Sequence, residues 1–354
     1  MKNSEKPSKR ITINDVAQKA GVSKSTVSHV INNTRFVEDV TRKRVEDAIS
    51  VLNYRPSIIA RSLVKKQTST IGLLISDVNN PFYHEVIHGV ESIALQNGYD
   101  IFLCNTHYDL DQAMKYVQSL EDKLVDGVLC MTSSLSREIL LELSANRIPM
   151  VVLDWHTAEV EDLAASITID FSKGIQAAVQ HLVDLGHTNF AHVSGPLDFW
   201  TSRLRRDLFL KALSEFGIDP GSAFIVEGDL WIDGGRRALE EICKSDPRPS
   251  AVFAANDLMA LGLIWAARDH DIHIPEDLSV VGLDDIELGA QINPPLTTVS
   301  LPRFKIGASA MQILMKLIDG TQEAGEDITR MNQVVETNLI IRQSTMQAKQ
   351  ALEK

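Results

Sequence analysis

Hydrophobic residues recur with two different periods along this chain of 354 residues. Up to residue 52 they recur every three or four positions, which predicts short helices over 12–20, from Ser23 onward and over 41–52. From residue 70 onward, short apolar runs alternate with longer amphipathic stretches. These runs are expected to be buried strands, at residues 71–75, 100–104, 127–130, 149–153, 190–193, 250–254 and 279–283.

The alternation after residue 70 predicts an α/β architecture. Strands that are apolar along their whole length are typical of parallel sheets covered by helices on both faces. The amphipathic stretches near 83–96 and 112–123 can supply such helices. The chain is long enough for more than one domain. We therefore expect a body of two doubly wound parallel-sheet lobes.

The first helices are expected to form an all-α, helix-turn-helix head. Gly21 provides a tight turn after the first helix, and Ser23 can cap the second helix. The positions expected to face the core are Val27, Val30 and Ile31, and those expected to face outward are Lys24, Ser25, Ser28 and His29. This arrangement is typical of DNA-binding heads, although plain helical bundles show the same spacing.

Charge is distributed unevenly along the chain. Residues 1–66 hold 14 Lys and Arg against 6 Asp and Glu, a net charge of +8, whereas the rest of the chain carries −20. A basic head on an acidic body is typical of a module that binds a polyanion such as nucleic acid. A solvated, charged domain without such a partner would have the same charges.

Three features indicate the compartment. Met1–Arg10 is polar and basic with no apolar segment behind it, so no secretory signal is predicted. No stretch reaches the ~18 apolar residues of a membrane-spanning helix. The three cysteines, Cys104, Cys130 and Cys243, lie far apart, as expected of reduced core thiols. We expect a cytoplasmic protein.

In doubly wound sheets, ligands bind beyond the carboxyl ends of the strands. Applied to the predicted strands, this rule selects residues 76–83, 154–155, 194–198, 256–257 and 284–285. Several of these segments hold carboxylates or amides, which can bind hydroxyl groups, beside aromatic rings, which can cover a sugar or a base. The sequence therefore predicts a pocket for a small polar ring.

The residues of the head are more specific than their spacing. Ile13–Ala17, Ala20–Ser23 and Ser25–Asn32 closely resemble the head of the lactose/galactose repressor family of bacterial transcription regulators, and the resemblance runs from about Thr12 to Arg342. Within that family the chain looks most like the ribose and purine repressors. The resemblance implies a helix-turn-helix domain over 10–56, a hinge helix and linker over 57–69, a two-lobed, periplasmic-binding-protein-like effector and dimerisation domain over 70–342, and a short tail over 343–354.

The resemblance also implies how the head binds double-stranded operator DNA. Lys24, Ser25 and His29 match positions that contact base edges in the major groove, and Arg35 matches another DNA-contacting position. The remaining candidates, for phosphate contacts or solvated surface, are Thr26, Arg42 and Arg44. In the family, a hinge leucine enters the minor groove when the hinge becomes helical, and Leu63 matches its position in this chain. In the free protein so short a helix is unstable, so a disordered linker is expected.

The same resemblance implies an effector site that includes residues from both lobes. Its expected members are Asn80, Phe82, Tyr83, Asp154, Trp155, Arg205, Asn256 and Asp284. Other roles stay open for four of them: Phe82 and Trp155 as core aromatics, Asn256 as a helix cap and Asp284 as a turn residue. Departures from the family pattern at Phe171, Phe199, Trp200, Leu230 and Leu301 make the pocket more apolar. A pentose or related sugar is the expected effector, with a purine base or nucleoside as the alternative.

The function predicted from these features is that of a homodimeric, effector-controlled transcriptional regulator, most readily a repressor, which needs no cofactor. A transport receptor is the alternative from another class, but the basic head and the missing signal peptide argue against it. An enzyme is not expected, because no phosphate-binding loop, nucleophile elbow or zinc-ligand spacing occurs. Residues 269–273 contain metal-capable side chains, but we expect a solvated connector there and no metal.

Overall fold

The computed structural model describes residues 11–54, 67–132, 136–153, 163–320 and 332–349. The chain divides into two compact units, Met1–Ser69 and Thr70–Lys354. Three of the predicted site residues, Leu63, Asp154 and Trp155, lie outside the described residues, as does most of the predicted hinge. The predicted domain boundaries stay predictions.

The first unit contains the predicted helices, α1 (Ile13–Ala20), α2 (Lys24–Asn32) and α3 (Asp39–Val51). Their shared core is apolar, with Val16, Val27 and Val45 fully buried. The side chain of Ser23 accepts a hydrogen bond from the backbone N–H of Thr26 at 3.1 Å, so Ser23 caps α2 as predicted. The turn before it contains Gly21 in the left-handed region, with φ of 66°. The helix-turn-helix head is confirmed.

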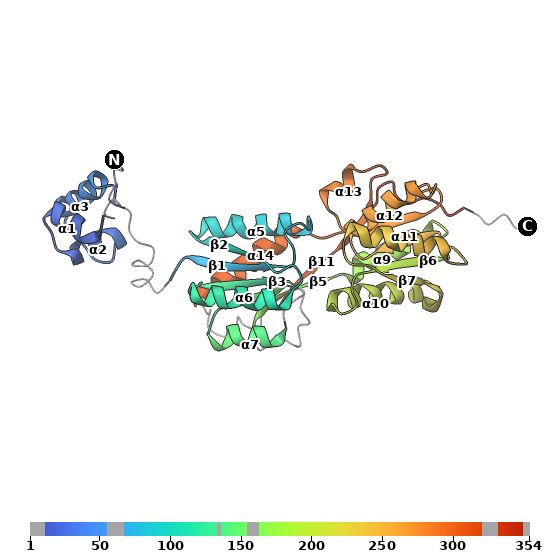
Figure 1. Ribbon diagram of the computed structural model, residues 1–354, viewed down its shortest axis with the longest axis horizontal. Helices are drawn as coiled ribbons and strands as arrows, with labels where there is room; N and C mark the ends of the chain where they lie inside the picture. Colours follow the sequence, from blue (N-terminus) through green and yellow to red (C-terminus); the bar gives the residue numbers. More distant parts are fainter. Residues whose placement is uncertain (1–10, 55–66, 133–135, 154–162, 321–331, 350–354) are drawn as a thin grey trace, which may run out of the picture. The chain divides into compact units, whose positions relative to one another are not determined.

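The second unit begins with a parallel sheet that has six strands among the described residues. In sheet order its strands are β11 (Asn332–Glu336), β5 (Ala165–Asp170), β4 (Met150–Leu153), β3 (Gly127–Met131), β1 (Thr70–Ile75) and β2 (Asp100–Asn105). The helices of this first lobe are α5 (Phe82–Gln96), α6 (Leu110–Asp122), α7 (Arg137–Ala145) and α14 (Arg303–Asp319). They lie on both faces of the sheet (Figure 1), which keeps β1 and β3 buried along their length.

The second lobe repeats this plan. Its strands, in sheet order, are β12 (Asn338–Ile340), β10 (Thr297–Ser300), β9 (Ser279–Asp284), β8 (Ala251–Ala254), β6 (Phe190–Ser194) and β7 (Phe224–Glu227). Its helices are α9 (Ser172–Asp184), α10 (Trp200–Glu215), the short η1 (Pro220–Ser222), α11 (Ile232–Lys244), α12 (Asp257–Asp269) and α13 (Glu287–Gln291). The edge strand β12 runs antiparallel to β10, whereas the other pairs are parallel. The predicted fold class, two doubly wound lobes behind a helical head, is confirmed.

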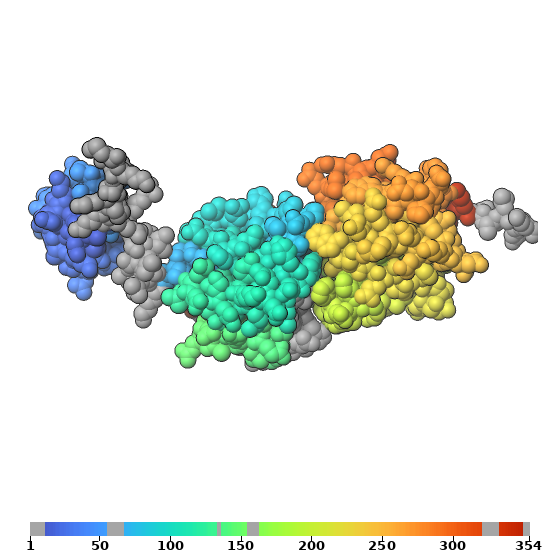
Figure 2. All heavy atoms as spheres, viewed as in Figure 1, coloured from blue at the N-terminus to red at the C-terminus, as the bar shows by residue number. Residues whose placement is uncertain are grey.

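The chain passes between the lobes where β5 leads to α9, where β10 leads to α14 and where β11 leads to β12. Two of these passages are hydrogen-bonded to each other, because the hydroxyl of Thr337 donates to the carbonyl of Asp170 at 2.9 Å and accepts from the N–H of Gly174 at 3.2 Å. One apolar cluster includes buried residues of both sheets. In Figure 2 the two lobes meet along one seam.

The described part of the predicted tail, residues 343–349, packs on the second lobe. Ser344 is fully buried: its hydroxyl donates to the carbonyl of Val280 at 2.6 Å and accepts from the N–H of Thr297 at 2.8 Å. Further along, the ammonium of Lys349 contacts a carboxylate oxygen of Asp277 at 2.5 Å. Among the described residues, no helix has the length and apolar character needed to cross a membrane.

Candidate functional site

Polar residues gather where the strands of both sheets end. In the first lobe Ser76, Asp77 and Asn80 follow β1, and in the second lobe Asn256 follows β8 and Asp284 ends β9. All five are buried. These are the strand ends that the sequence predicts, and they lie at the carboxyl edge of each sheet.

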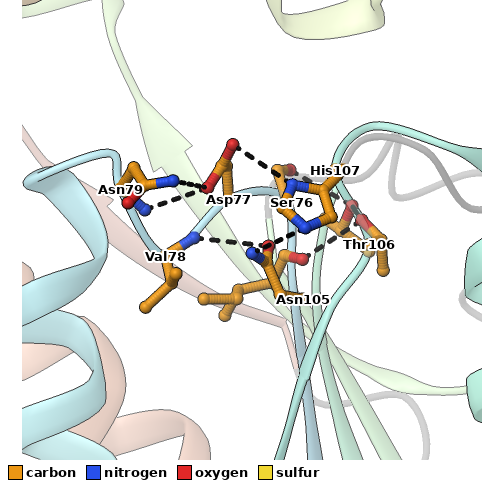
Figure 3. Close-up of polar contacts among 9 residues, drawn as sticks. Ser76, Asp77, Val78, Asn79, Asn105, Thr106 and His107 are labelled. Atoms are coloured by element: carbon orange, nitrogen blue, oxygen red, sulfur yellow. Dashed lines mark hydrogen bonds and ion pairs between the residues drawn. The ribbon is translucent and has the colours of Figure 1, made fainter.

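The loops after β1 and β2 are tied together by polar contacts, drawn in Figure 3. Asp77 accepts from the backbone N–H of Asn79 at 2.9 Å, and its other oxygen lies 3.5 Å from Nδ1 of His107. The side-chain oxygen of Asn105 accepts from the N–H of Val78 at 3.3 Å. These contacts fix the first-lobe wall of the site.

Tyr83 connects this wall to the second lobe. Its ring is buried, it is hydrogen-bonded to Ser76, and burial raises the pKa of its phenol to about 12. The same pKa is raised by the charge of Asp284 and lowered by that of Arg205, so Tyr83 lies within electrostatic range of both. Its neighbour Phe82 is half-buried against the first-lobe core and meets the Tyr83 ring edge-on, with ring centroids 5.1 Å apart.

Arg205, on α10, is a partly buried donor beside the Phe171 ring. One guanidinium nitrogen donates to the carbonyl of Ala255 at 2.8 Å, and the guanidinium carbon lies 4.6 Å from the centre of the Phe171 ring. Its Nε is buried and has no hydrogen-bond partner in the described structure. Since an unpaired buried donor is costly, this N–H can bind an acceptor supplied by a ligand.

The predicted residues of the second lobe include Asn256 and Asp284, which are both buried. Asn256 caps α12, because its oxygen accepts from the N–H of Met259 at 2.9 Å while its amide nitrogen donates to the carbonyl of Leu230 at 2.8 Å. The cap role left open for it is therefore real. Asp284 is 4% exposed and has φ of 123°. Its carboxylate can accept hydrogen bonds from hydroxyl or N–H groups.

An aromatic pair joins the two lobes. Tyr108, in the loop after β2, stacks on Phe199, which precedes α10, with ring centroids 5.5 Å apart and planes at 24°. The Tyr108 phenol is hydrogen-bonded to Asn80, and burial raises its pKa above the usual range for tyrosine. Sequence reasoning missed Tyr108, although the strand-end rule, applied to the strand at 100–105, would have selected it.

The structure thus brings Asn80, Tyr83, Arg205 and Asp284 into one cluster, with Tyr108 added. Phe82 packs in the core, as one of its two interpretations proposed. Leu301 is buried in the same core, while Leu230 is half-buried with φ of 68°. No group of three or more His, Cys, Asp or Glu among the described residues is placed to hold a metal ion.

The predicted DNA-contacting residues of the head lie on α2 and the loop after it. Lys24, Ser25 and Arg35 are exposed, whereas Thr26 and His29 are partly exposed. The His29 ring contacts the hydroxyl of Thr34 at 2.9 Å, and Arg42 donates to the side chain of Asn33 at 3.1 Å. Arg44 donates to the carbonyl of Gly21 at 3.3 Å. Arg42 and Arg44 therefore help to fix the head.

Comparison with known proteins identifies both units. Residues 12–57 match the family described as bacterial regulatory proteins, lacI family, and residues 179–345 match the periplasmic binding protein-like domain. The HTH-type transcriptional repressor PurR of Aliivibrio salmonicida (strain LFI1238) is 41% identical over 313 residues, covering 87% of this chain and 92% of that protein. PurR of Vibrio atlanticus (strain LGP32) is 43% identical over 310 residues, with the same coverage.

Solved structures agree with these relatives. The lac repressor dimer bound to operator and the anti-inducer ONPF matches with a TM-score of 0.84 at 30% identity, covering 96% of this chain and all of that chain. A LacI family regulator from Enterococcus faecium with bound ribose matches with a TM-score of 0.70 at 27% identity over 79% of this chain and all of that chain. The chain therefore belongs to the lacI family of bacterial regulatory proteins, and it is a sequence-specific, DNA-binding transcriptional repressor and not an enzyme.

Proposed function

We propose that this repressor is controlled by a pentose-sized sugar that binds between its two lobes. The observation that carries the proposal is the buried Nε–H of Arg205, which lacks an acceptor among the described residues. The charges of Arg205 and Asp284 both shift the pKa of the buried Tyr83, so the three side chains lie within electrostatic range of one another. A sugar hydroxyl can accept from this N–H and donate to Asp284 at the same time. The unpaired group would then contribute binding free energy.

The charges around the cleft favour a neutral ligand. Asp77 and Asp284 are carboxylates at the strand ends, whereas Arg205 is the cation of the cluster described above, and Asp285 is paired with Arg342. A phosphorylated sugar would bring its negative charge close to these acids, and like charges at short distance repel strongly where water is excluded. The LacI family regulator from Enterococcus faecium was solved with bound ribose, which is such a neutral ring.

A purine base or nucleoside is the second candidate. The curated relatives with 41% to 43% identity carry the name PurR. In addition, the rings of Tyr108 and Phe199, which stack on each other across the cleft, offer flat apolar surfaces to a heterocycle. The hydrogen-bonding groups of the cluster suit the ring nitrogens of a base as well as the hydroxyls of a sugar.

We further propose that Lys24, Ser25 and His29 read base edges in the major groove, with Thr26 and Arg35 as additional contacts. Leu63, which lies outside the described residues, is proposed as the wedge that enters the minor groove. Because two hinges and two heads are needed for a pseudo-palindromic site, the repressor is proposed to bind as a homodimer in the cytoplasm. Occupancy of the cleft would change how the two hinges pair, which links effector binding to operator binding.

A thermal-shift screen tests the effector proposal. D-ribose, D-xylose and L-arabinose would be compared with hexoses, nucleosides, adenine, guanine and hypoxanthine on the full chain. A ligand of the native state at about one hundred times its Kd stabilises the protein by about 2.7 kcal/mol, so a pentose should raise Tm, and Arg205→Met should reduce the rise at the same ligand concentration. A rise with purines alone would replace the sugar by the second candidate.

A further inference from the structure

We infer that Asp257 is a positioning residue of the cleft, which holds the turn Asp284–Ile286 in the conformation that presents Asp284 to a ligand. The inference rests on the proposed function, in which Asp284 accepts hydrogen bonds from the effector. Asp257 itself is the first residue of α12 and is fully buried, so we infer that it acts through the turn and not by contact with the ligand.

The carboxylate of Asp257 joins three elements of the second lobe. Its Oδ1 accepts from the hydroxyl of Thr298, on β10, at 2.6 Å. Its Oδ2 accepts from the backbone N–H of Ile286, directly after β9, at 2.8 Å. Both oxygens therefore have a donor on another element, and the N–H of Ile286 belongs to the turn that follows Asp284.

The turn needs such support because its backbone is strained. Asp284 and Asp285 are consecutive non-glycine residues with φ of 123° and 57°, and left-handed backbone is unfavourable for residues with a Cβ. The side chain of Asp285 is also held, since it accepts from the hydroxyl of Ser300 at 2.9 Å and from the guanidinium of Arg342 at 2.7 Å. Asp257 supplies the backbone contact that fixes the end of the turn.

The neighbouring strand leaves space for this carboxylate. Gly282 lies on β9, and a Cβ built there would fall 2.2 Å from Oδ1 of Asp257, which is too close for any side chain. A larger residue at this position would displace either the carboxylate or the strand. The absence of a side chain at Gly282 therefore leaves the space that the carboxylate of Asp257 occupies.

Burial gives the contact a pH signature. Desolvation raises the pKa of Asp257 to about 6, although the hydrogen bonds from Thr298 and Ile286 lower it. Among charged groups, Asp285 on the turn raises this pKa and Arg303 on α14 lowers it. Protonation removes the negative charge of Asp257, and a neutral carboxyl accepts from the N–H of Ile286 less strongly than a carboxylate does, so the turn is held less firmly below about pH 6.

The first test measures the turn itself. Hydrogen exchange of the peptide spanning Asp284–Ile286 is followed by mass spectrometry in the ligand-free full chain, for the wild type and the variants Asp257→Ala, Asp257→Asn and Thr298→Val. Faster exchange in Asp257→Ala, with partial protection in Asp257→Asn, supports the inference. Asp277→Asn removes a carboxylate with contacts to His273 and Lys349 elsewhere on this lobe and serves as the control. Unchanged exchange in Asp257→Ala and Thr298→Val would overturn the inference.

The second test uses D-ribose as the probe, with affinity measured by calorimetry between about pH 5 and pH 8. Thr298→Val, which keeps the shape of the side chain, should weaken binding roughly three- to tenfold. Asp257→Asn should bind with an affinity that no longer falls below about pH 6. If these variants show altered hydrogen exchange but bind D-ribose with the affinity and the pH dependence of the wild type, the inferred role of Asp257 in binding is overturned. If the wild type does not bind D-ribose, the sugar proposal fails, and the exchange experiment alone decides whether Asp257 holds the turn.

Discussion

Burial determines what the single polar residues of the cleft can do. The Tyr83 ring and the Nε of Arg205 are buried, so water does not compensate there for a missing hydrogen-bond partner. A ligand that provides the partner therefore gains more binding free energy than it would at an exposed site. Conversely, removing the donor of Arg205, which is only partly buried, should reduce binding strongly with less effect on the core than a change at Tyr83.

Replacing Arg205 by Met tests this reasoning. The variant keeps an apolar side chain over Phe171 but loses the donor, and a hydrogen bond to a charged group contributes about 1.5–3 kcal/mol. We expect roughly a 10- to 150-fold weaker affinity for D-ribose by calorimetry. Arg206→Met, on the same helix, removes a guanidinium that pairs with Asp207 and should leave the affinity unchanged. Equal losses in both variants would contradict a specific role for Arg205.

A single buried histidine, His192, gives a prediction about how stability depends on pH. Its ring is fully buried beside Phe209 and Phe253, and desolvation lowers its pKa from 6.5 to about 4. The folded protein thus resists protonation, so this contribution to stability is complete above pH 6.5 and is lost as pH falls toward about 4. Urea unfolding should show a loss of about 2 kcal/mol between about pH 7 and pH 5. His192→Gln should lack that part of the pH dependence, and an identical dependence in the variant would refute the assignment.

Among the elements, the loop after β2 in the first lobe and the start of α10 in the second lobe contact each other through one aromatic pair. The consecutive residues His107 and Tyr108 have φ of 52° and 59°, and Tyr108 stacks on Phe199. Aromatic pairs of this kind contribute about 0.5–1.5 kcal/mol beyond the area they bury. The stack is therefore expected to favour the closed arrangement of the lobes.

A double-mutant cycle measures this contact. Tyr108→Ala, Phe199→Ala and the double variant should give a coupling free energy of about 0.5–1.5 kcal/mol in urea unfolding. His88 and Phe304, whose ring centroids lie 5.3 Å apart between α5 and α14, form a reference pair within one lobe. A coupling close to zero for Tyr108 and Phe199 would mean that the stack does not hold the lobes together.

The elements were largely predictable, whereas some of their contacts were not. Periodicity predicted the helices of the head and seven of the strands, because burial of an apolar face leaves a local pattern. The strands β5, β7, β10, β11 and β12 were not predicted, and β12, only three residues long, also pairs antiparallel at the edge of its sheet. The strand-end rule selected Asp257, but the sequence did not indicate that it holds the turn after β9. Its partners Thr298 and Ile286 are distant in sequence, and only the folded lobe brings them together.

For the whole molecule, the opposite charges of the head and the body separate DNA binding from effector binding. The +8 head can neutralise phosphates, while the −20 body repels the duplex. Leu63→Ala should therefore weaken specific DNA binding by more than about tenfold in a fluorescence-anisotropy titration, because the minor-groove wedge is lost. D-ribose affinity should stay unchanged in this variant. Wild-type DNA affinity would contradict the wedge role.

The central claim is that occupancy of the cleft sets the affinity for DNA. It is tested most directly by titrating the full-length repressor onto a genomic fragment that it has itself selected, with and without saturating D-ribose. Coupling of about 1–3 kcal/mol predicts a change of roughly 5- to 150-fold in Kd, and Arg205→Met should remove that change. The same Kd with and without sugar, in a wild-type protein that demonstrably binds D-ribose, would contradict the account.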